Sequence, residues 1–176
     1  MIRVFDNVER FTCGTVGQPG ERAFFIQVRS AFAAATVSVE KSQVQALAER
    51  LRYMVKEIKL MHPLTQIPAS PKDLAPLDTP IEDDFRVGSM ALFFDDESEL
   101  IQVDLRESDG DIEEDSDDDL MGDIEVVRLY IKANQALSFA DRADALMGAG
   151  RLPCPFCAMP INPTGHLCAR ANGYRR

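Results

Sequence analysis

Four potential metal ligands lie close together near the end of the chain, within residues 154–168. Cys154 and Cys157 form a Cys-x2-Cys pair, a spacing that lets two thiolates bind one ion from a tight turn. Eight residues separate this pair from His166 and Cys168, and they include two prolines and a glycine, with which the chain can reverse. Soft thiolates and an imidazole in a closed tetrahedron favour Zn²⁺ over Mg²⁺ or Ca²⁺. The sequence therefore predicts one structural zinc ion held by these four residues.

The tail, residues 151–176, needs such an ion in order to fold. It has few apolar residues, so it cannot bury enough surface to order itself unaided. A structural zinc contributes on the order of 10 to 16 kcal/mol in small zinc peptides. The second ligand pair, His166-x-Cys168, is tighter than the usual spacing, so a turn at Gly165 has to reorient its two side chains.

Two other states of the cysteines remain open. The first is a redox pair of Cys154 and Cys157, which would require a strand-to-helix setting that Pro153 and Pro155 do not favour. The second is a set of thiols that bind no metal. A catalytic zinc would need an open coordination position and a nearby proton carrier, yet no acidic residue follows Asp144. A structural role is therefore expected for the metal.

Composition indicates one globular domain with a small appendage. Apolar residues make up 45% of the 176 residues, which is typical of a chain with a sizeable core. No segment approaches the roughly 20 apolar residues that span a bilayer, and the first residues lack the apolar run of a secretory signal. We therefore expect a soluble, cytoplasmic protein without membrane insertion. In that reducing compartment, clustered cysteines favour metal binding over disulfides.

Charge is segregated along the chain. The net charge is −10, and residues 107–123 hold ten acidic residues and no basic one. The remaining 19 acids equal the 19 lysines and arginines, so this acidic run carries the whole excess. It does not fit the calcium-loop pattern, and we interpret it as a solvated loop or as a competitor for a basic partner surface. The tail has no acidic residue, and its charged side chains are four arginines: Arg151, Arg170, Arg175 and Arg176.

Hydrophobic periodicity predicts an α+β fold made of two similar halves. Period-two alternation predicts strands at 2–5, 10–16, 22–29 and 34–40, then at 85–94, 99–106 and 124–132. Each half ends in a helix, at 41–60 and at 134–147. We expect an α+β domain over 1–150, with antiparallel sheet-plus-helix halves at 1–61 and 81–150. A proline-rich linker over 62–80 joins them, and no convincing sequence identity relates them.

The helices are expected to bury one apolar face each on the sheet. The stripe of the first helix comprises Val44, Leu47, Ala48, Leu51, Met54, Val55 and Ile58, and that of the second comprises Ala136, Leu137, Ala140, Ala143 and Leu146. Outside the tail, Cys13 lies in a predicted strand and is interpreted as a small buried hydrophobe. His62 is interpreted as a surface histidine. No set of nucleophile, base and orienting residue is recognisable, so catalytic residues are not assigned.

The element order and the motifs resemble known families at two levels. The repeated strands-then-helix order resembles PUR-repeat and Whirly-type binders of single-stranded nucleic acid, in topology only. The whole chain resembles an actinobacterial family of uncharacterised proteins, domain of unknown function 3090. This second resemblance is carried by FTCGTVGQPGERAFFIQV, IKANQALSFADRADALMGAGR and LPCPFCAMPINPTGHLCARANGY. It implies a cytoplasmic protein encoded beside a phosphatidylinositol-kinase-like protein and a phosphoglycerate-mutase-like phosphatase.

Three functions of different classes are considered: two follow from these patterns, and the third is an enzyme whose site is not recognisable in the sequence. The first is a non-catalytic zinc-binding accessory or regulatory protein that docks a protein partner, such as a kinase-like or phosphatase-like enzyme. The second is a single-stranded nucleic-acid binder that uses the basic zinc tail for phosphate contacts and base stacking. The residues expected to contact a partner or a phosphate are Arg151, Arg170, Tyr174, Arg175 and Arg176.

Overall fold

The computed structural model describes residues 1–18, 20–69, 72–108, 124–148, 154–159, 161, 165–168 and 170. Over these residues the chain forms seven strands and two helices, whose bounds agree with the predicted ones to within two residues. In chain order they are β1 (Ile2–Phe5), β2 (Arg10–Val16), β3 (Ala23–Arg29), β4 (Ala34–Val39), α1 (Lys41–Met61), β5 (Phe85–Asp95), β6 (Leu100–Glu107), β7 (Val126–Ile131) and α2 (Ala133–Gly148). In this part of the chain, neither helix has the length and apolar character needed to cross a membrane.

The seven strands form one mixed sheet in the order β1-β7-β6-β5-β4-β3-β2. Within each half the strands pair antiparallel, as expected, whereas β4 with β5 and β1 with β7 pair in parallel. The predicted α+β class is confirmed. The two halves are joined edge to edge in a single sheet, because the long linker returns Phe85 alongside Val37 of β4.

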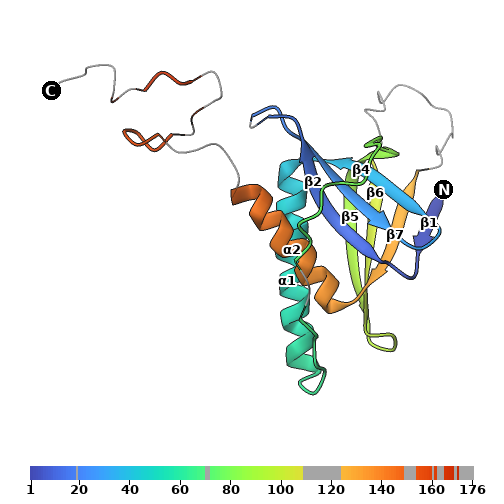
Figure 1. The fold of residues 1–176 in the computed structure, drawn as a ribbon. Helices are drawn as coiled ribbons and strands as arrows, with labels where there is room; N and C mark the ends of the chain where they lie inside the picture. The colour runs from blue at the N-terminus through green and yellow to red at the C-terminus, as the bar shows by residue number, and fades with distance from the viewer. Residues whose placement is uncertain are drawn as a thin grey trace, which may run out of the picture.

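The two edges of this sheet, β1 and β2, are consecutive in the chain. Only residues 6–9 separate them, so the edges lie at most about 18 Å apart. The sheet must therefore curl, and Figure 1 shows it strongly curved, with both helices gathered on the same side. This curvature encloses the core between the sheet and the helices.

Both helices pack their apolar faces into that core. All seven residues of the predicted α1 stripe are buried. In α2 the three predicted alanines are buried, Leu137 and Leu146 are partly buried, and Phe139 is buried in addition. The Phe139 ring stacks on Phe11 of β2, with ring centroids 4.3 Å apart. The prediction missed Phe139 because it lies beside the alanine stripe and becomes buried only when β2 packs against α2.

Both helices begin with the same hydrogen-bonded cap. The Gln43 side chain accepts a hydrogen bond from the Glu40 amide at 2.8 Å and donates to the Val87 carbonyl at 3.0 Å. In α2, Gln135 accepts from the Lys132 amide at 2.9 Å and donates to the Val8 carbonyl at 2.7 Å. Each glutamine therefore caps its helix. Gln43 also links the start of α1 to β5, and Gln135 links the start of α2 to the residues before β2.

The proline-rich linker packs on the sheet. Its described residues form no helix or strand, as predicted. Residues 72–78, here called the strap, begin beside α2 and then cross the outer face of β2 and β3, which is the face opposite the helices. Leu77 of the strap is 8% exposed and lies over Gly14, where an added Cβ would approach the Leu77 side chain to 2.5 Å. Gly14 therefore leaves the space that Leu77 fills.

An acidic side chain, Asp104, is fully buried on the outer face of the second half of the sheet. Arg128 on the neighbouring strand donates to both of its carboxylate oxygens, at 2.8 and 2.7 Å, and Gln102 donates to one of them at 2.9 Å. The hydrogen bonds from Arg128 hold the pKa of Asp104 below its ordinary value, against the opposing effect of burial.

Replacement of Gly14 by valine is expected to destabilise the protein. The added methyl groups would force Leu77 out of its place on the sheet, at a cost of about 1–3 kcal/mol. Chemical denaturation measures this as a lower denaturant midpoint with an unchanged slope. Unchanged stability would show that the strap does not rest on Gly14.

The Asp104→Asn variant is expected to be less stable at neutral pH by about 2 kcal/mol, because Arg128 loses its charged partner. A carboxyl whose pKa is lowered by folding stabilises the folded state above its unfolded pKa. That stability is lost as the pH falls through the lower, folded value. The unfolding free energy of the wild type should therefore fall below about pH 4, and that of the variant should fall less steeply. Parallel pH profiles for the two proteins would contradict this assignment.

Candidate metal centre

Residues 154–159 form a tight turn closed by two backbone hydrogen bonds. The Ala158 amide donates to the Cys154 carbonyl, and the Cys154 amide donates to the Met159 carbonyl, both at 2.8 Å. Ala158 takes a positive φ of 60°, a conformation that few residues other than glycine adopt. The turn presents the side chains of Cys154 and Cys157 on the same side, as the Cys-x2-Cys spacing predicted.

Gly165 stands in the left-handed region with φ +87°, directly before His166. This confirms the turn that the short His-x-Cys spacing required. Because glycine has no Cβ, it adopts this conformation without steric cost. The turn directs His166 and Cys168 toward the first pair of cysteines.

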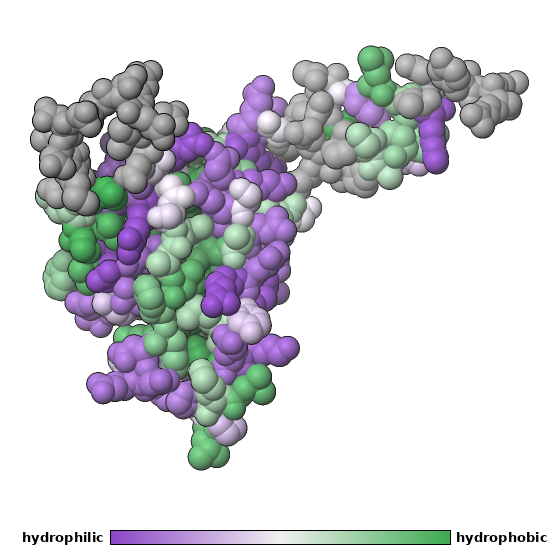
Figure 2. All heavy atoms as spheres, turned by 180° about the vertical axis from the view of Figure 1, so that it is seen from behind, coloured by the Kyte–Doolittle hydropathy of each residue, from purple (hydrophilic) through white to green (hydrophobic). Residues whose placement is uncertain are grey.

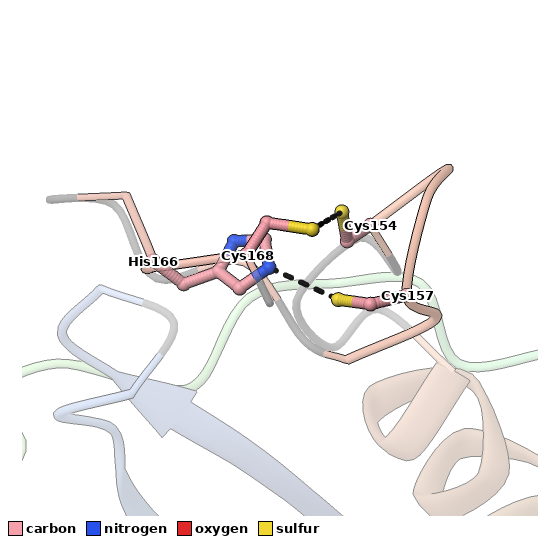
Figure 3. A group of neighbouring side chains, drawn as sticks. All are labelled: Cys154, Cys157, His166 and Cys168. Atoms are coloured by element: carbon pink, nitrogen blue, oxygen red, sulfur yellow. Dashed lines mark hydrogen bonds between the residues drawn. The ribbon is translucent and has the colours of Figure 1, made fainter. Parts of the chain in front are cut away.

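The four predicted ligands converge on one point, as Figure 3 shows. Their nearest possible ligand atoms all lie within 4.8 Å of one another. The Sγ atoms of Cys154 and Cys168 are 3.8 Å apart, and the Sγ of Cys157 lies 3.2 Å from Nε2 of His166. Residues that are up to 14 positions apart in sequence therefore share one small site.

These distances fit a shared tetrahedral ion. Two thiolates bound to zinc at about 2.3 Å lie about 3.8 Å from each other in a tetrahedron, which is the separation of Cys154 and Cys168. A disulfide would bring the sulfurs to about 2.05 Å. All four cysteines of the chain are described, and none forms a disulfide. Three sulfurs and one imidazole nitrogen make up a donor set suited to a soft or borderline metal ion.

The local electrostatics favour an ionised thiol at one position of the cluster. Backbone amides of Cys157 and Phe156 donate to the Cys154 sulfur and lower the pKa of Cys154. At Cys157 the Met159 amide acts in the same direction, but burial and the neighbouring cysteines outweigh it and raise the pKa of Cys157. The neighbouring thiols thus favour ionisation of Cys154 and disfavour ionisation of Cys157, and a bound cation would favour the ionised form of both.

Three large apolar side chains close to the ligands in sequence are exposed to solvent. Cys154 and Cys168 are buried, whereas Phe156, Met159 and Leu167 are 63%, 62% and 90% exposed. Among the described tail residues, two of the four ligands are thus buried and two half-buried, while three large apolar side chains are exposed, which is typical of a surface that contacts another molecule.

The residues predicted to contact a partner or a phosphate are only partly covered by the structure. Arg170 is exposed, and its guanidinium donates to the Phe156 carbonyl at 3.3 Å, so it lies beside the metal cluster. Arg151, Tyr174, Arg175 and Arg176 lie outside the described residues, as does the acidic run from residue 109 to residue 123.

Cys13 and His62, the two residues of the body considered as candidates, both lie in settings that suggest no chemical role. Cys13 is fully buried in β2, as predicted, and burial raises the pKa of its thiol to about 12. His62 follows the end of α1, and its Nε2 lies 3.2 Å from Asp96 at the β5–β6 turn. The sequence did not link these two residues, because 34 positions separate them.

A groove of about 650 Å³ runs between α2 and the strap. Arg142 crosses it, donating to the carbonyls of Cys13 and Asp73. The carboxylates that line the groove also have basic partners. Asp141 and Asp144 both pair with Arg52 of α1, at 3.1 and 2.7 Å. These acids link the two helices.

One family model matches residues 3–168 of the chain, and its description is "Protein of unknown function (DUF3090)". The match covers all of the sheet except Ile2, both helices and all four predicted metal ligands. No curated protein and no solved structure matches the chain. The match agrees with the resemblance drawn from the sequence motifs.

Purified protein is expected to contain one equivalent of a transition metal per chain, measured by elemental analysis. The Cys154→Ala variant should lose most of it, because three remaining donors leave an incomplete shell. Cys13→Ala is the matched control, since it removes a buried thiol from the body and should leave the metal content unchanged. Acidification from about pH 7.5 to about pH 5 should release the metal, because protons compete for the ligands. Wild-type protein free of metal would contradict the site.

Proposed function

The chain belongs to the DUF3090 family, and we propose that it is a non-catalytic, zinc-binding accessory protein that docks a protein partner. The observation that carries this proposal is the cluster itself: four protein donors within 4.8 Å, with large apolar side chains exposed around them. Four protein donors would fill a tetrahedral zinc shell and leave no position for a substrate or a water molecule.

Zinc is the metal that best suits this donor set. Three thiolates and one imidazole are typical ligands of closed structural zinc sites. When bound, the ion supplies the cross-link that a short, apolar-poor tail lacks. In this proposal Phe156, Met159 and Leu167, held in place by the metal-folded tail, contact the protein partner. The tail, 151–176, acts in this proposal as a metal-folded appendage of the 1–150 domain.

The partner is proposed to be a kinase-like or phosphatase-like enzyme, which is the class that the family resemblance suggests. Thiolate ligands stay reduced in the cytoplasm, so that compartment is the proposed location. The alternative is binding of single-stranded nucleic acid. Among the described tail residues, Arg170 supports it as a possible phosphate contact, although its guanidinium also donates a hydrogen bond to the Phe156 carbonyl.

The test is a pull-down from native lysate with tagged, metal-loaded protein, followed by mass spectrometry. We expect a protein partner whose recovery falls about tenfold or more when the tail ligands are changed to Cys154→Ser and Cys168→Ser. The Cys13→Ala protein serves as the matched control and should recover the partner as well as the wild type does.

Two outcomes would oppose the proposal. Recovery of no protein partner across several salt concentrations would remove the docking function. Retention of labelled single strands at low salt, with a steep loss as salt is raised, would favour the nucleic-acid alternative instead. A nuclease-treated lysate separates direct protein contacts from contacts through nucleic acid.

A further inference from the structure

The two halves of the sheet repeat the same ladder of cross-strand pairs. In the first half, Gln27 of β3 pairs with one residue of β2 and one of β4, and the β3–β4 ladder ends at Arg29. In the second half, Asp104 of β6 pairs in the same way with β5 and β7, and the β6–β7 ladder ends at Arg106. Arg29 and Arg106 are therefore equivalent, and so are Gln27 and Asp104.

The helices continue this equivalence. When the capping glutamines Gln43 and Gln135 are matched, two more identities follow at the same spacing. Five residues later both helices have alanine, and seven residues later both have arginine, Arg50 and Arg142. The two halves thus repeat in strand register, in helix capping and at individual positions. What one half does with its outer face is a guide to the other.

The outer face of the first half binds an extended segment of the same chain, the strap. Arg10 donates to the Asp73 carboxylate at 2.9 and 3.1 Å and to the Asp78 carboxylate at 2.9 Å. Arg29 also donates to Asp78, at 2.9 Å. Gln27 exchanges hydrogen bonds with the Asp78 backbone at 2.8 and 2.9 Å, as a neighbouring strand would. Two arginines on this face thus receive two strap carboxylates.

The equivalent face of the second half carries no such segment among the described residues. It is called here the open face, and it is formed by Phe93, Gln102, Asp104, Arg106, Arg128 and Tyr130. Phe93 takes the place of Gly14 in the ladder and is 55% exposed, so its ring projects from the position that Leu77 covers in the first half. Beside the open face, Val4 of β1 is 51% exposed, and Figure 2 shows green spheres at the edge of the body where β1 lies.

The open face has one carboxylate fewer than it has arginines. It has two arginines, like the first face, but only one carboxylate, Asp104. Arg128 occupies both oxygens of Asp104, whereas Arg106 reaches it only at 3.7 Å and keeps a side chain that is 49% exposed. Among the described residues, Arg106 therefore has no close carboxylate partner, whereas Arg29 pairs with Asp78 at 2.9 Å.

We propose that the open face binds an extended acidic segment of a protein partner, in the way that the first face binds the strap. One carboxylate of the segment pairs with Arg106, and an apolar side chain packs on Phe93. A phosphate chain suits this face less well, because it would bring repeated negative charge next to Asp104, whereas the proposed segment places a single carboxylate at Arg106. The inference rests on the proposed function and deepens it, since it names a surface and the chemistry of the segment that docks there.

The probe is a fluorescein-labelled peptide with the strap sequence, Lys-Asp-Leu-Ala-Pro-Leu-Asp. The strap occupies its own face at a high effective concentration, so added peptide has only the open face available. We expect saturable binding by fluorescence anisotropy, with amide shifts confined to β5, β6 and β7 in NMR spectra. Arg106→Gln should weaken binding about tenfold, because a charge-assisted hydrogen bond is lost, and Phe93→Ala should also weaken it.

Matched controls isolate the carboxylate contact. Lys56→Gln removes a positive charge from an exposed position of α1 and should change binding less than about twofold. A peptide with both aspartates replaced by asparagine should bind weakly and should no longer distinguish Arg106→Gln from the wild type. Arg106 is exposed, so this variant is expected to fold, and its melting curve verifies that.

Several outcomes would overturn the inference. They are no saturable binding up to about 1 mM peptide, binding that Arg106→Gln leaves unchanged, and binding of a labelled oligonucleotide but not of the peptide. Binding seen only after residues 109–123 are replaced by Gly-Ser repeats would make the chain's own acidic run the occupant. Because these variants keep all four metal ligands, peptide binding and metal-dependent partner recovery can fail independently.

Discussion

The parallel pairing of β5 with β4 is the contact on which the rest of the body depends. It is short, with Val37 opposite Phe85 and Ser38 opposite Arg86, yet it turns two antiparallel units into one sheet. Phe5 of β1 repeats it by pairing with Leu129 of β7. These two parallel pairings curl the sheet and place both helices on one side. They also leave two outer faces, of which the strap covers one.

The tail and the body are stabilised by different interactions. The body is held by burial: its strands and helices enclose Ile101, Val103 and Leu129 without exposure to solvent. Among its described residues the tail exposes Phe156, Met159 and Leu167, so these side chains contribute little hydrophobic driving force to its folding. Its order depends on bringing three sulfurs and one nitrogen to a common point, which is a local, directional interaction. The two parts can therefore respond separately to heat and to chelation.

Local patterns predicted most of the fold, and long-range contacts account for the rest. Period-two and period-3.6 alternation gave every strand and helix, and the Cys-x2-Cys and His-x-Cys spacings identified ligands that do converge. The strap, the burial of Asp104 and the pairing of His62 with Asp96 were missed, because each depends on residues far apart in sequence. The repeat was also missed, since only sparse identities such as Arg50 with Arg142 survive between the halves. These become visible only when the strand register is known.

The closeness of the two sheet edges has a consequence for behaviour at high concentration. An open sheet presents a free row of amides and carbonyls at each margin, which recruits other chains into fibrous assemblies. Here residues 6–9 keep the end of β1 close to the start of β2, and the Glu9 amide extends the β2–β3 pairing by donating to the Arg29 carbonyl at 2.8 Å. In the described sheet β1 pairs with β7 alone and β2 with β3 alone, so each edge keeps one row of backbone groups without a strand partner. Because the connection holds one end of β1 near one end of β2, an incoming chain that reaches one of these rows is also close to the other.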